Sequence, residues 1–130
     1  MTRQLPAISL LVLLSACTNL APEKNIQVEV NPRQGEEVRQ ICFASSINGW
    51  REVEGERSSV ILTKGVSEEY KLDLSGTCDL TYAFNSIATR TRGSSCLTRG
   101  DDIIFNDGLS GTRRCMIKNI HKWNPALPTE

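Results

Sequence analysis

The chain has 130 residues, and its 15 Lys and Arg residues are balanced by 15 Asp and Glu residues. This length leaves room for one domain. A nucleic-acid-binding domain normally has a basic excess that neutralises phosphates, so the balance argues against nucleic acid as a partner. It also provides no strong electrostatic attraction to an anionic lipid surface. Any membrane association must therefore come from a particular segment of the chain.

Residues 1–16 have the layout of a secretory signal peptide. Arg3 provides the positive charge, and an apolar stretch follows from Leu5 to Leu14. About ten apolar residues are too few to span a bilayer, which takes about 20. The sequence Leu14-Ser15-Ala16-Cys17 comes next, and it resembles the lipobox of bacterial lipoproteins, in which a branched apolar residue and two small ones precede a cysteine.

This resemblance implies that residues 1–16 are removed and that the sulfur of Cys17 receives a lipid. Thr18 stands where an aspartate would signal retention in the inner membrane, so the resemblance favours the outer membrane, facing the periplasm. Two or three acyl chains on one residue anchor a protein stably, whereas a single chain holds it only marginally. We therefore expect a lipid-anchored envelope protein. The alternative is an ordinary signal peptide with an incidental cysteine.

Residues 17–35 are predicted to be the lipidated cysteine and a flexible tether, which would span at most about 60 Å when extended. Ile26, Val28 and Val30 alternate within it, so a short edge strand at Ile26–Val30 is a further option. From residue 36 to residue 123 the pattern changes to that of a folded domain, and residues 124–130 are expected to be a C-terminal tail. In this domain turn signals recur about every ten residues: Asn48-Gly49, Glu54-Gly55, Lys64-Gly65, Ser75-Gly76, Arg92-Gly93, Arg99-Gly100 and Asn106-Asp107-Gly108.

Short runs rich in β-branched and aromatic residues lie between these turns. In the run Tyr70–Leu74, apolar residues alternate with Lys71 and Asp73, which predicts one buried and one solvent-exposed face. Asp79 is expected to cap one short helical turn within residues 79–84. The pattern as a whole predicts an all-β domain, a small antiparallel barrel or sandwich of about six short strands. The runs are Val38–Phe43, Val60–Thr63, Tyr70–Leu74, Ile87–Thr91, Ile103–Phe105 and Cys115–Ile120.

Four cysteines remain besides Cys17, and they are Cys42, Cys78, Cys96 and Cys115. An even number in an exported chain predicts two disulfide bonds, which would reinforce a modest core. Each would contribute about 4 kcal/mol in the chain-entropy model. Spacing alone does not choose among the three pairings. A zinc site is disfavoured because paired zinc ligands normally lie about 2–4 residues apart.

Five short motifs stand out within residues 38–123: Cys42 with Ile47-Asn48-Gly49-Trp50, the segment Tyr70–Leu80, Arg92-Gly93-Ser94-Ser95, Gly100-Asp101, and Arg114–Ile120. Together they resemble a family of small proteobacterial lipoproteins that is grouped only as a domain of unknown function. Relatives with a single cysteine pair have it at the positions that match Cys78 and Cys115. The resemblance therefore implies the pairs Cys78–Cys115 and Cys42–Cys96, and it implies no activity.

Arginines are the main candidate binding residues. Arg90 and Arg92 alternate along one predicted strand, so their side chains should point the same way. If Arg113 or Arg114 lies on a neighbouring strand, the set would bind phosphate or carboxylate groups, such as those of lipid A and peptidoglycan. The alternative is a solvated face whose arginines pair with Asp101, Asp102 and nearby glutamates.

A hydrolase triad can be written from Ser94 or Ser95, His121, and Asp101 or Asp102. No nucleophile-elbow pattern surrounds the serines, and His121 lies in a polar C-terminal run. Structural roles in turns fit these residues better, so no catalytic residue is expected.

Two further features also fit structural roles. A group of oxygen ligands lacks the spacing of a calcium loop, so no metal is expected; it consists of Asp101, Asp102, Asn106 and Asp107. Trp50 follows Asn48-Gly49, and a tryptophan beside a turn more often covers the core than binds a ligand.

The leading functional prediction is a non-catalytic, tethered β domain that needs no cofactor and binds another envelope component, a protein or a glycan. One alternative is an inhibitor of lysozyme-type or other hydrolases, because this chain has the size and anchor of such inhibitors. A second alternative, a cell-wall-acting enzyme, would require two carboxylates that flank a cleft. The candidate glutamates lie near predicted turns, which fits a soluble rim better: Glu52, Glu54, Glu56, Glu68 and Glu69.

Overall fold

The computed structural model describes residues 29–75, 78–83, 87–108 and 111–126. Their fold is all-β, as expected, with nine strands in place of the expected six or so, and with two single 3-10 turns, η1 (Ala44–Ser46) and η2 (Leu80–Tyr82). Within these residues no helix is long and apolar enough to cross a membrane. The strands are β1 (Gln34–Glu37), β2 (Gln40–Cys42), β3 (Ile47–Val53), β4 (Glu56–Lys64), β5 (Glu68–Leu74), β6 (Ile87–Arg90), β7 (Cys96–Thr98), β8 (Asp102–Asn106) and β9 (Thr112–Trp123).

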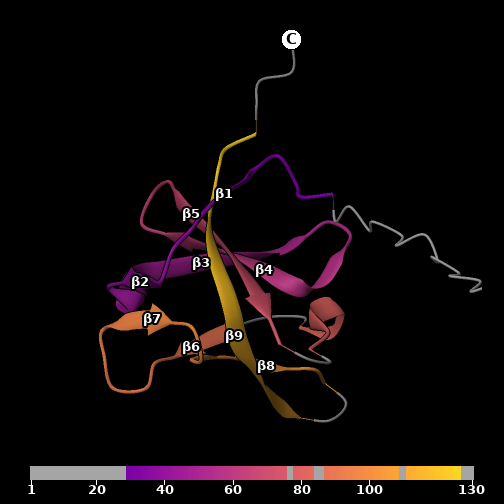
Figure 1. Cartoon of the computed structure of the whole chain (residues 1–130). Helices are drawn as coiled ribbons and strands as arrows, with labels where there is room; N and C mark the ends of the chain where they lie inside the picture. The colour runs from indigo at the N-terminus through magenta and orange to yellow at the C-terminus, as the bar shows by residue number, and fades with distance from the viewer. Residues whose placement is uncertain (1–28, 76–77, 84–86, 109–110, 127–130) are drawn as a thin grey trace, which may run out of the picture.

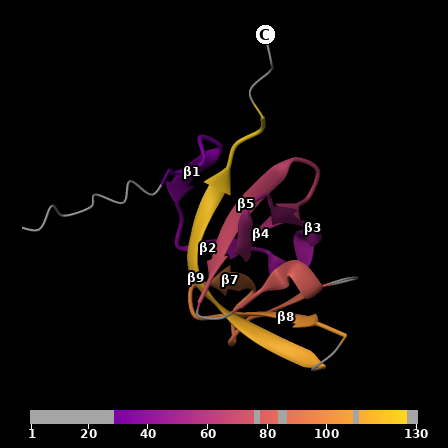
Figure 2. The same cartoon turned by 90° about the vertical axis from the view of Figure 1, so that its right-hand side faces the viewer.

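Seven strands form one antiparallel sheet in the order β3-β4-β5-β9-β8-β6, with β1 paired to the C-terminal part of β9. The long strand β9 crosses the whole molecule (Figure 1), pairing with β8 through its first half and with β5 through its second. The sheet is strongly curled (Figure 2), so that its inner face encloses the core like an open half-barrel. Strands β2 and β7 form a separate two-stranded sheet.

The core follows from the alternation of side chains along the strands. On β8, Ile103 and Phe105 are buried, and on β9, Cys115 and Ile117 are buried beside them. The same cluster takes Ile41 from β2 and Leu97 from β7, so the small sheet packs against the open side of the curled sheet. The cluster also contains Val60, Leu62, Leu72, Leu74, Leu80, Ala83 and Ile120, and Trp50 packs against it while half-buried.

Bulges on β9 and on β3 change the register that simple alternation would give. On β9, Ile117 pairs with Leu74 but Asn119 pairs with Asp73, so Lys118 is an extra residue. The expected turn at Asn48-Gly49 is wrong, because these residues lie inside β3 at a bulge next to Ile47. Asn and Gly, which favour turns, also favour bulges, because turns and bulges both bend the backbone. The Asn48 side chain donates a hydrogen bond to the carbonyl oxygen of Gly65.

The disulfide bonds join Cys42 to Cys96 and Cys78 to Cys115, the pairing that the family resemblance implies. The first links directly opposed residues of β2 and β7, and the second ties the segment before η2 to β9. The turn η2 lies where a helical turn was expected, and the carboxylate of Asp79 caps it by accepting a hydrogen bond from the Thr81 amide at 2.9 Å. Hydrogen bonds from the side chain and then the amide of Thr81 lower the pKa of Asp79 below its usual value.

The folded part begins slightly before the expected boundary at residue 36. The Arg33 guanidinium stacks on the Trp123 ring at 5.0 Å, and the Arg33 carbonyl accepts a hydrogen bond from the Asn124 amide. The option of an edge strand at Ile26–Val30 lies mostly outside the described residues, and Val30 is exposed and in no strand.

The sequence predicts that Lys71 lies on a solvent-exposed face of β5. This prediction is wrong, because Lys71 is only 5% exposed. The Lys71 ammonium donates to Gln34, on β1, and contacts Glu56, at the start of β4. The outer face of the sheet therefore has its own small cluster here, formed by Val53, Ile61 and Trp123. Alternation distinguishes the two faces of a strand, but it does not say what covers each face.

Candidate functional site

The outward face of β6, β8 and β9 presents an exposed group of cations. Arg90 on β6 is opposite Asp102 on β8, which in turn is opposite Met116 on β9. Arg114 and Lys118 lie two residues before and after Met116 on the same strand, and both are exposed. We call the surface formed by Arg90, Arg114, Met116 and Lys118 the cationic face.

The spacing of strands sets the size of this face. Alternate residues of β9 are about 7 Å apart, so Arg114 and Lys118 lie about 13 Å from each other. Two strand spacings place Arg90 about 10 Å from Met116. Within the described ranges no carboxylate is within ion-pair distance of Arg90, Arg114 or Lys118. Three positive charges therefore face solvent around a partly exposed methionine, and the one carboxylate in register between Arg90 and Met116, that of Asp102, pairs with Arg92.

The structure brings together only part of the arginine cluster predicted from the sequence. Arg92 lies at the rim of the face, 3.6 Å from the Asp102 carboxylate. Arg113 pairs in register with the buried Phe105, so it leaves β9 on the side opposite to Arg114, and it contacts Asp107 at 3.6 Å. Lys118 belongs to the cationic face but was not among the predicted residues.

The chemistry of this face suits a ligand with several negative groups. Each guanidinium offers paired N–H donors to a carboxylate or phosphate. Because the side chains are exposed, a single contact in water contributes only about 0.2–1 kcal/mol. Useful affinity therefore requires an anion that engages several of the cations together. Met116, which is 45% exposed, adds an apolar contact between them.

The residues of the candidate hydrolase triad are not brought together. The Ser94 hydroxyl donates to the Cys96 carbonyl at 2.8 Å and accepts from the Cys96 amide, which is a local turn contact. The His121 Nε2 atom lies 3.8 Å from the carboxylate of Asp73, not from that of Asp101 or Asp102. These positions provide no serine activated by a base.

The candidate calcium ligands are each engaged in structural contacts. Buried Asp101 accepts hydrogen bonds from the Arg92 amide and from the amide and hydroxyl of Thr98, at 2.7–2.9 Å. The Asn106 side chain accepts from the Gly108 amide at 2.8 Å. In the part of the chain that the structure describes, no three His, Cys, Asp or Glu residues are grouped so that they could hold a metal ion.

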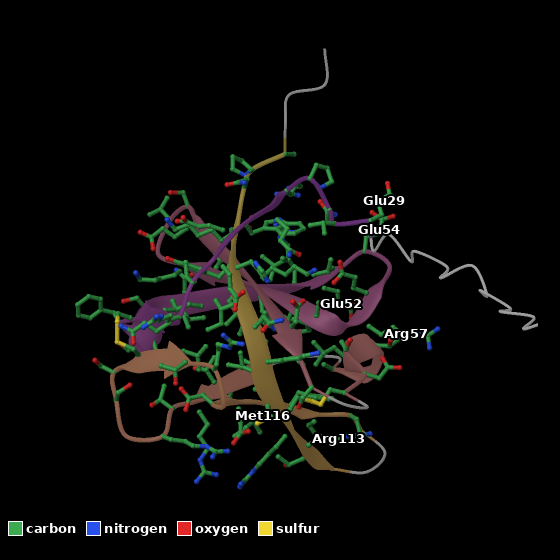
Figure 3. All side chains as sticks on the ribbon, in the orientation of Figure 1. Glu29, Glu52, Glu54, Arg57, Arg113 and Met116 are labelled. Atoms are coloured by element: carbon green, nitrogen blue, oxygen red, sulfur yellow. A yellow bond between two sulfur atoms is a disulfide. The ribbon has the colours of Figure 1, made fainter. Side chains whose placement is uncertain are left out.

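A shallow depression of about 650 Å³ lies at the β3–β4 hairpin and is lined by Glu52, Glu54 and Glu56. Glu52 and Glu54 are exposed, and Figure 3 shows them on this hairpin, whereas Glu56 is bound to Lys71. Glycoside hydrolysis needs one carboxyl group that burial keeps protonated. Glu52 and Glu54 are exposed, so neither has the burial of such a carboxyl group.

The comparisons with known proteins give a family and no activity. The chain matches a family of unknown function (DUF6491) over residues 1–127. The chain belongs to this family. No curated protein and no solved structure matches the chain. The cationic face must therefore be interpreted from its own geometry.

A second polar cluster lies on the outer face of β5 and β9, and sequence reasoning missed it. The Asp73 carboxylate accepts a hydrogen bond from the Ser59 hydroxyl at 3.0 Å, and it also lies 3.4 Å from the Lys71 ammonium. Asp73 stands between Ser59 and His121, so the imidazole does not contact the hydroxyl, and Ser59 is buried away from solvent. The contacts to Gln34 and Glu56 identify the cluster as a structural one that fixes β1 and the β3–β4 hairpin on the sheet.

Proposed function

We propose that this protein is a lipid-anchored module of the bacterial envelope that binds a carboxylate-rich polymer, the peptidoglycan, through its cationic face. The lipobox-like sequence Leu14-Ser15-Ala16-Cys17 supports the anchor, and two disulfide bonds fit an oxidising compartment. The observation that carries the binding proposal is the set of exposed cations without carboxylate partners on the described part of one sheet face.

The position of the face on the molecule favours a bridging role. Along β9, Arg114 lies about 30 Å from Trp123, next to which the N-terminal segment joins the sheet. Figure 3 shows Met116 at one end of the domain and Glu29, where the described chain begins, near the other. An anchor that pulls at Glu29 therefore leaves the cationic face free to meet a polymer away from the membrane.

Peptidoglycan matches the face better than a single small anion does. Its stem peptides carry repeated carboxylates, which can engage cations about 10–13 Å apart. The apolar surface of Met116 fits the mixed character of a peptide-bearing glycan. The net charge of the chain is zero, so attraction to this polymer would come from the local face and not from the whole molecule.

Binding is tested with the full chain purified from membranes in detergent and sedimented with isolated peptidoglycan. The double variant Arg90→Ala with Arg114→Ala should weaken binding about tenfold, which corresponds to about 1.4 kcal/mol for two exposed charge contacts. The matched control, Arg39→Ala with Arg57→Ala, removes the same charge elsewhere and should leave binding unchanged. Wild-type binding by the face variant, or equal binding to peptidoglycan whose carboxylates have been amidated, would refute the proposal.

The anchor is tested separately by mass spectrometry of the mature N-terminal peptide. A diacylglyceryl adduct on Cys17, absent from a Cys17→Ser variant, is the expected result. An unmodified Cys17 in the membrane-extracted protein would refute the anchoring part and leave the peptidoglycan measurement intact.

A further inference from the structure

Phe43 is exposed in a conformation that is costly for its side chain. Its φ is 59° and its ψ is 57°, the left-handed region that residues with a Cβ atom rarely adopt, and 66% of the residue is exposed. The Cys42–Cys96 disulfide bond holds the preceding residue. The Ala44 amide donates to the Ser95 carbonyl, and the Ser46 amide donates to the Phe43 carbonyl, both at 2.8 Å. The fold thus holds an aromatic ring in solvent at an energetic cost, and strain of this kind concentrates at functional sites.

A second apolar side chain is fixed near the first. Val66 is fully exposed in the turn between β4 and β5. The neighbouring Gly65 amide donates to the Ser46 carbonyl at 3.0 Å, and the Gly65 carbonyl accepts from the Asn48 side chain at 2.9 Å. These hydrogen bonds lock the β4–β5 turn to η1, so Phe43 and Val66 are presented from one rigid end of the domain.

An ion pair lies beside this end. The Lys64 ammonium lies 5.9 Å from the centre of the Phe43 ring and 3.1 Å from the carboxylate of Glu68. We call Phe43, Lys64 and Val66 the apolar tip. Exposed apolar side chains next to charged groups that stay in the head-group layer are the combination found in segments that insert into the boundary between lipid head groups and acyl chains.

We propose that the apolar tip inserts into the surface of the bilayer that anchors the chain, and so holds the domain in one orientation; this inference rests on the lipid anchor of the proposed function. The chain from Cys17 to Glu29 extends at most about 40 Å, so the anchor keeps the domain close to the bilayer. The anchor keeps the local lipid concentration high, so a weak insertion suffices.

A folded protein partner fits the tip less well. A stable protein interface covers about 800 Å² on each partner, whereas the tip projects only two apolar side chains from two turns. Insertion into lipid needs no complementary surface, because acyl chains fit around each side chain. The tip and the cationic face share no residue, so insertion does not use the groups proposed to bind peptidoglycan.

The test places tryptophan at the tip of the full chain, reconstituted in vesicles of phosphatidylethanolamine and phosphatidylglycerol with brominated acyl chains. In Phe43→Trp and in Val66→Trp, the added fluorescence should fall to half or less of its value in unbrominated vesicles. The control is Val30→Trp, because Val30 is 59% exposed outside the tip. Its added fluorescence should change little. Val66→Trp protects the test against misfolding, since Val66 has no packing to lose.

Flotation of the vesicles separates the two ways in which the test can fail. A chain that floats but shows equal quenching at positions 43, 66 and 30 overturns the insertion and leaves the anchor intact. A chain that does not float refutes the anchor, and quenching is then read at raised lipid concentration, where no excess at positions 43 and 66 over position 30 still overturns the insertion.

Discussion

Lys71 provides the sharpest test of how the outer face of the sheet is held together. The substitution Lys71→Met keeps most of the side-chain volume but removes the ammonium group. That group lies 2.7 Å from Glu56, 3.4 Å from Asp73 and 2.9 Å from the Gln34 side chain. Without it, two carboxylates are left without their shared cation beneath the N-terminal strand.

The expected cost follows from the burial of the partners. Removing one member of a fully buried ion pair costs about 3–5 kcal/mol. The Lys71 side chain is 6% exposed, but those of Glu56 and Asp73 are 35% and 27% exposed, so water screens part of the loss. We therefore expect Lys71→Met to lower the free energy of unfolding by about 2–3 kcal/mol.

The assay is guanidinium unfolding under non-reducing conditions, followed by tryptophan fluorescence, because Trp123 lies against this cluster. The control is Lys122→Met, which removes a lysine from the exposed pair with Glu36 and should change the unfolding midpoint little. If Lys71→Met is no more destabilising than Lys122→Met, the cluster does not hold the face together and the reasoning fails.

Three further predictions test other parts of the fold. Replacing Cys78 and Cys115 by alanine should cost about 4 kcal/mol, as should replacing Cys42 and Cys96, because the closed segments span 37 and 54 residues; a loss below about 1 kcal/mol for both pairs in thermal unfolding would contradict the chain-entropy estimate. The Arg99 guanidinium donates to the Lys118 carbonyl and the Asn119 side chain and pairs with Glu37. Because this side chain is partly exposed, Arg99→Ala should lower the free energy of urea unfolding by only about 1 kcal/mol. An unchanged free energy would show that these contacts are dispensable. A hydrogen bond from Lys64 lowers the pKa of Glu68 below its usual value of 4.5. The ionised carboxylate therefore stabilises the fold above pH 4.5, and this contribution disappears as the pH falls through the folded-state pKa. Glu68→Gln should lower the free energy of unfolding at pH 7 but not near pH 2, and an equal difference at both pH values would contradict this assignment.

The sequence revealed those strands whose side chains enter the core. Tyr70–Leu74 and Ile103–Phe105 were found because burial of one face imposes alternation on them. Strand β1, with the sequence Gln34-Gly35-Glu36-Glu37, has no apolar residue, since it adds backbone hydrogen bonds to β9 and places nothing in the core. Such a strand leaves no hydropathy pattern, and its presence is what buries Lys71.

The candidate site was predicted only as far as one strand determines it. Alternation places Arg114 and Arg113 on opposite faces of β9, but only the register with β8 decides which of them joins Arg90. Lys118 was missed because it is the extra residue of a bulge, and a bulge depends on the partner strand. Phe43 gave no signal either, since neither its exposure nor its left-handed backbone follows from the residue type.

The bulge at Lys118 divides the outer face of β9 into two halves that differ in how far other segments cover them. On the C-terminal half, β1 pairs beside His121 and Trp123, and Arg99 links β1 to β9 through Glu37 and the Lys118 carbonyl. On the N-terminal half, the described chain provides no covering segment, and Arg114 and Lys118 face solvent without an acidic partner there. The chain has equal numbers of acidic and basic residues, and two of its carboxylates lie next to the buried Lys71 ammonium. In the described part of the chain, the acidic residues therefore lie elsewhere on the molecule and not within ion-pair distance of Arg114 and Lys118. The asymmetry between the two halves is therefore the reason to seek a ligand on the bare one.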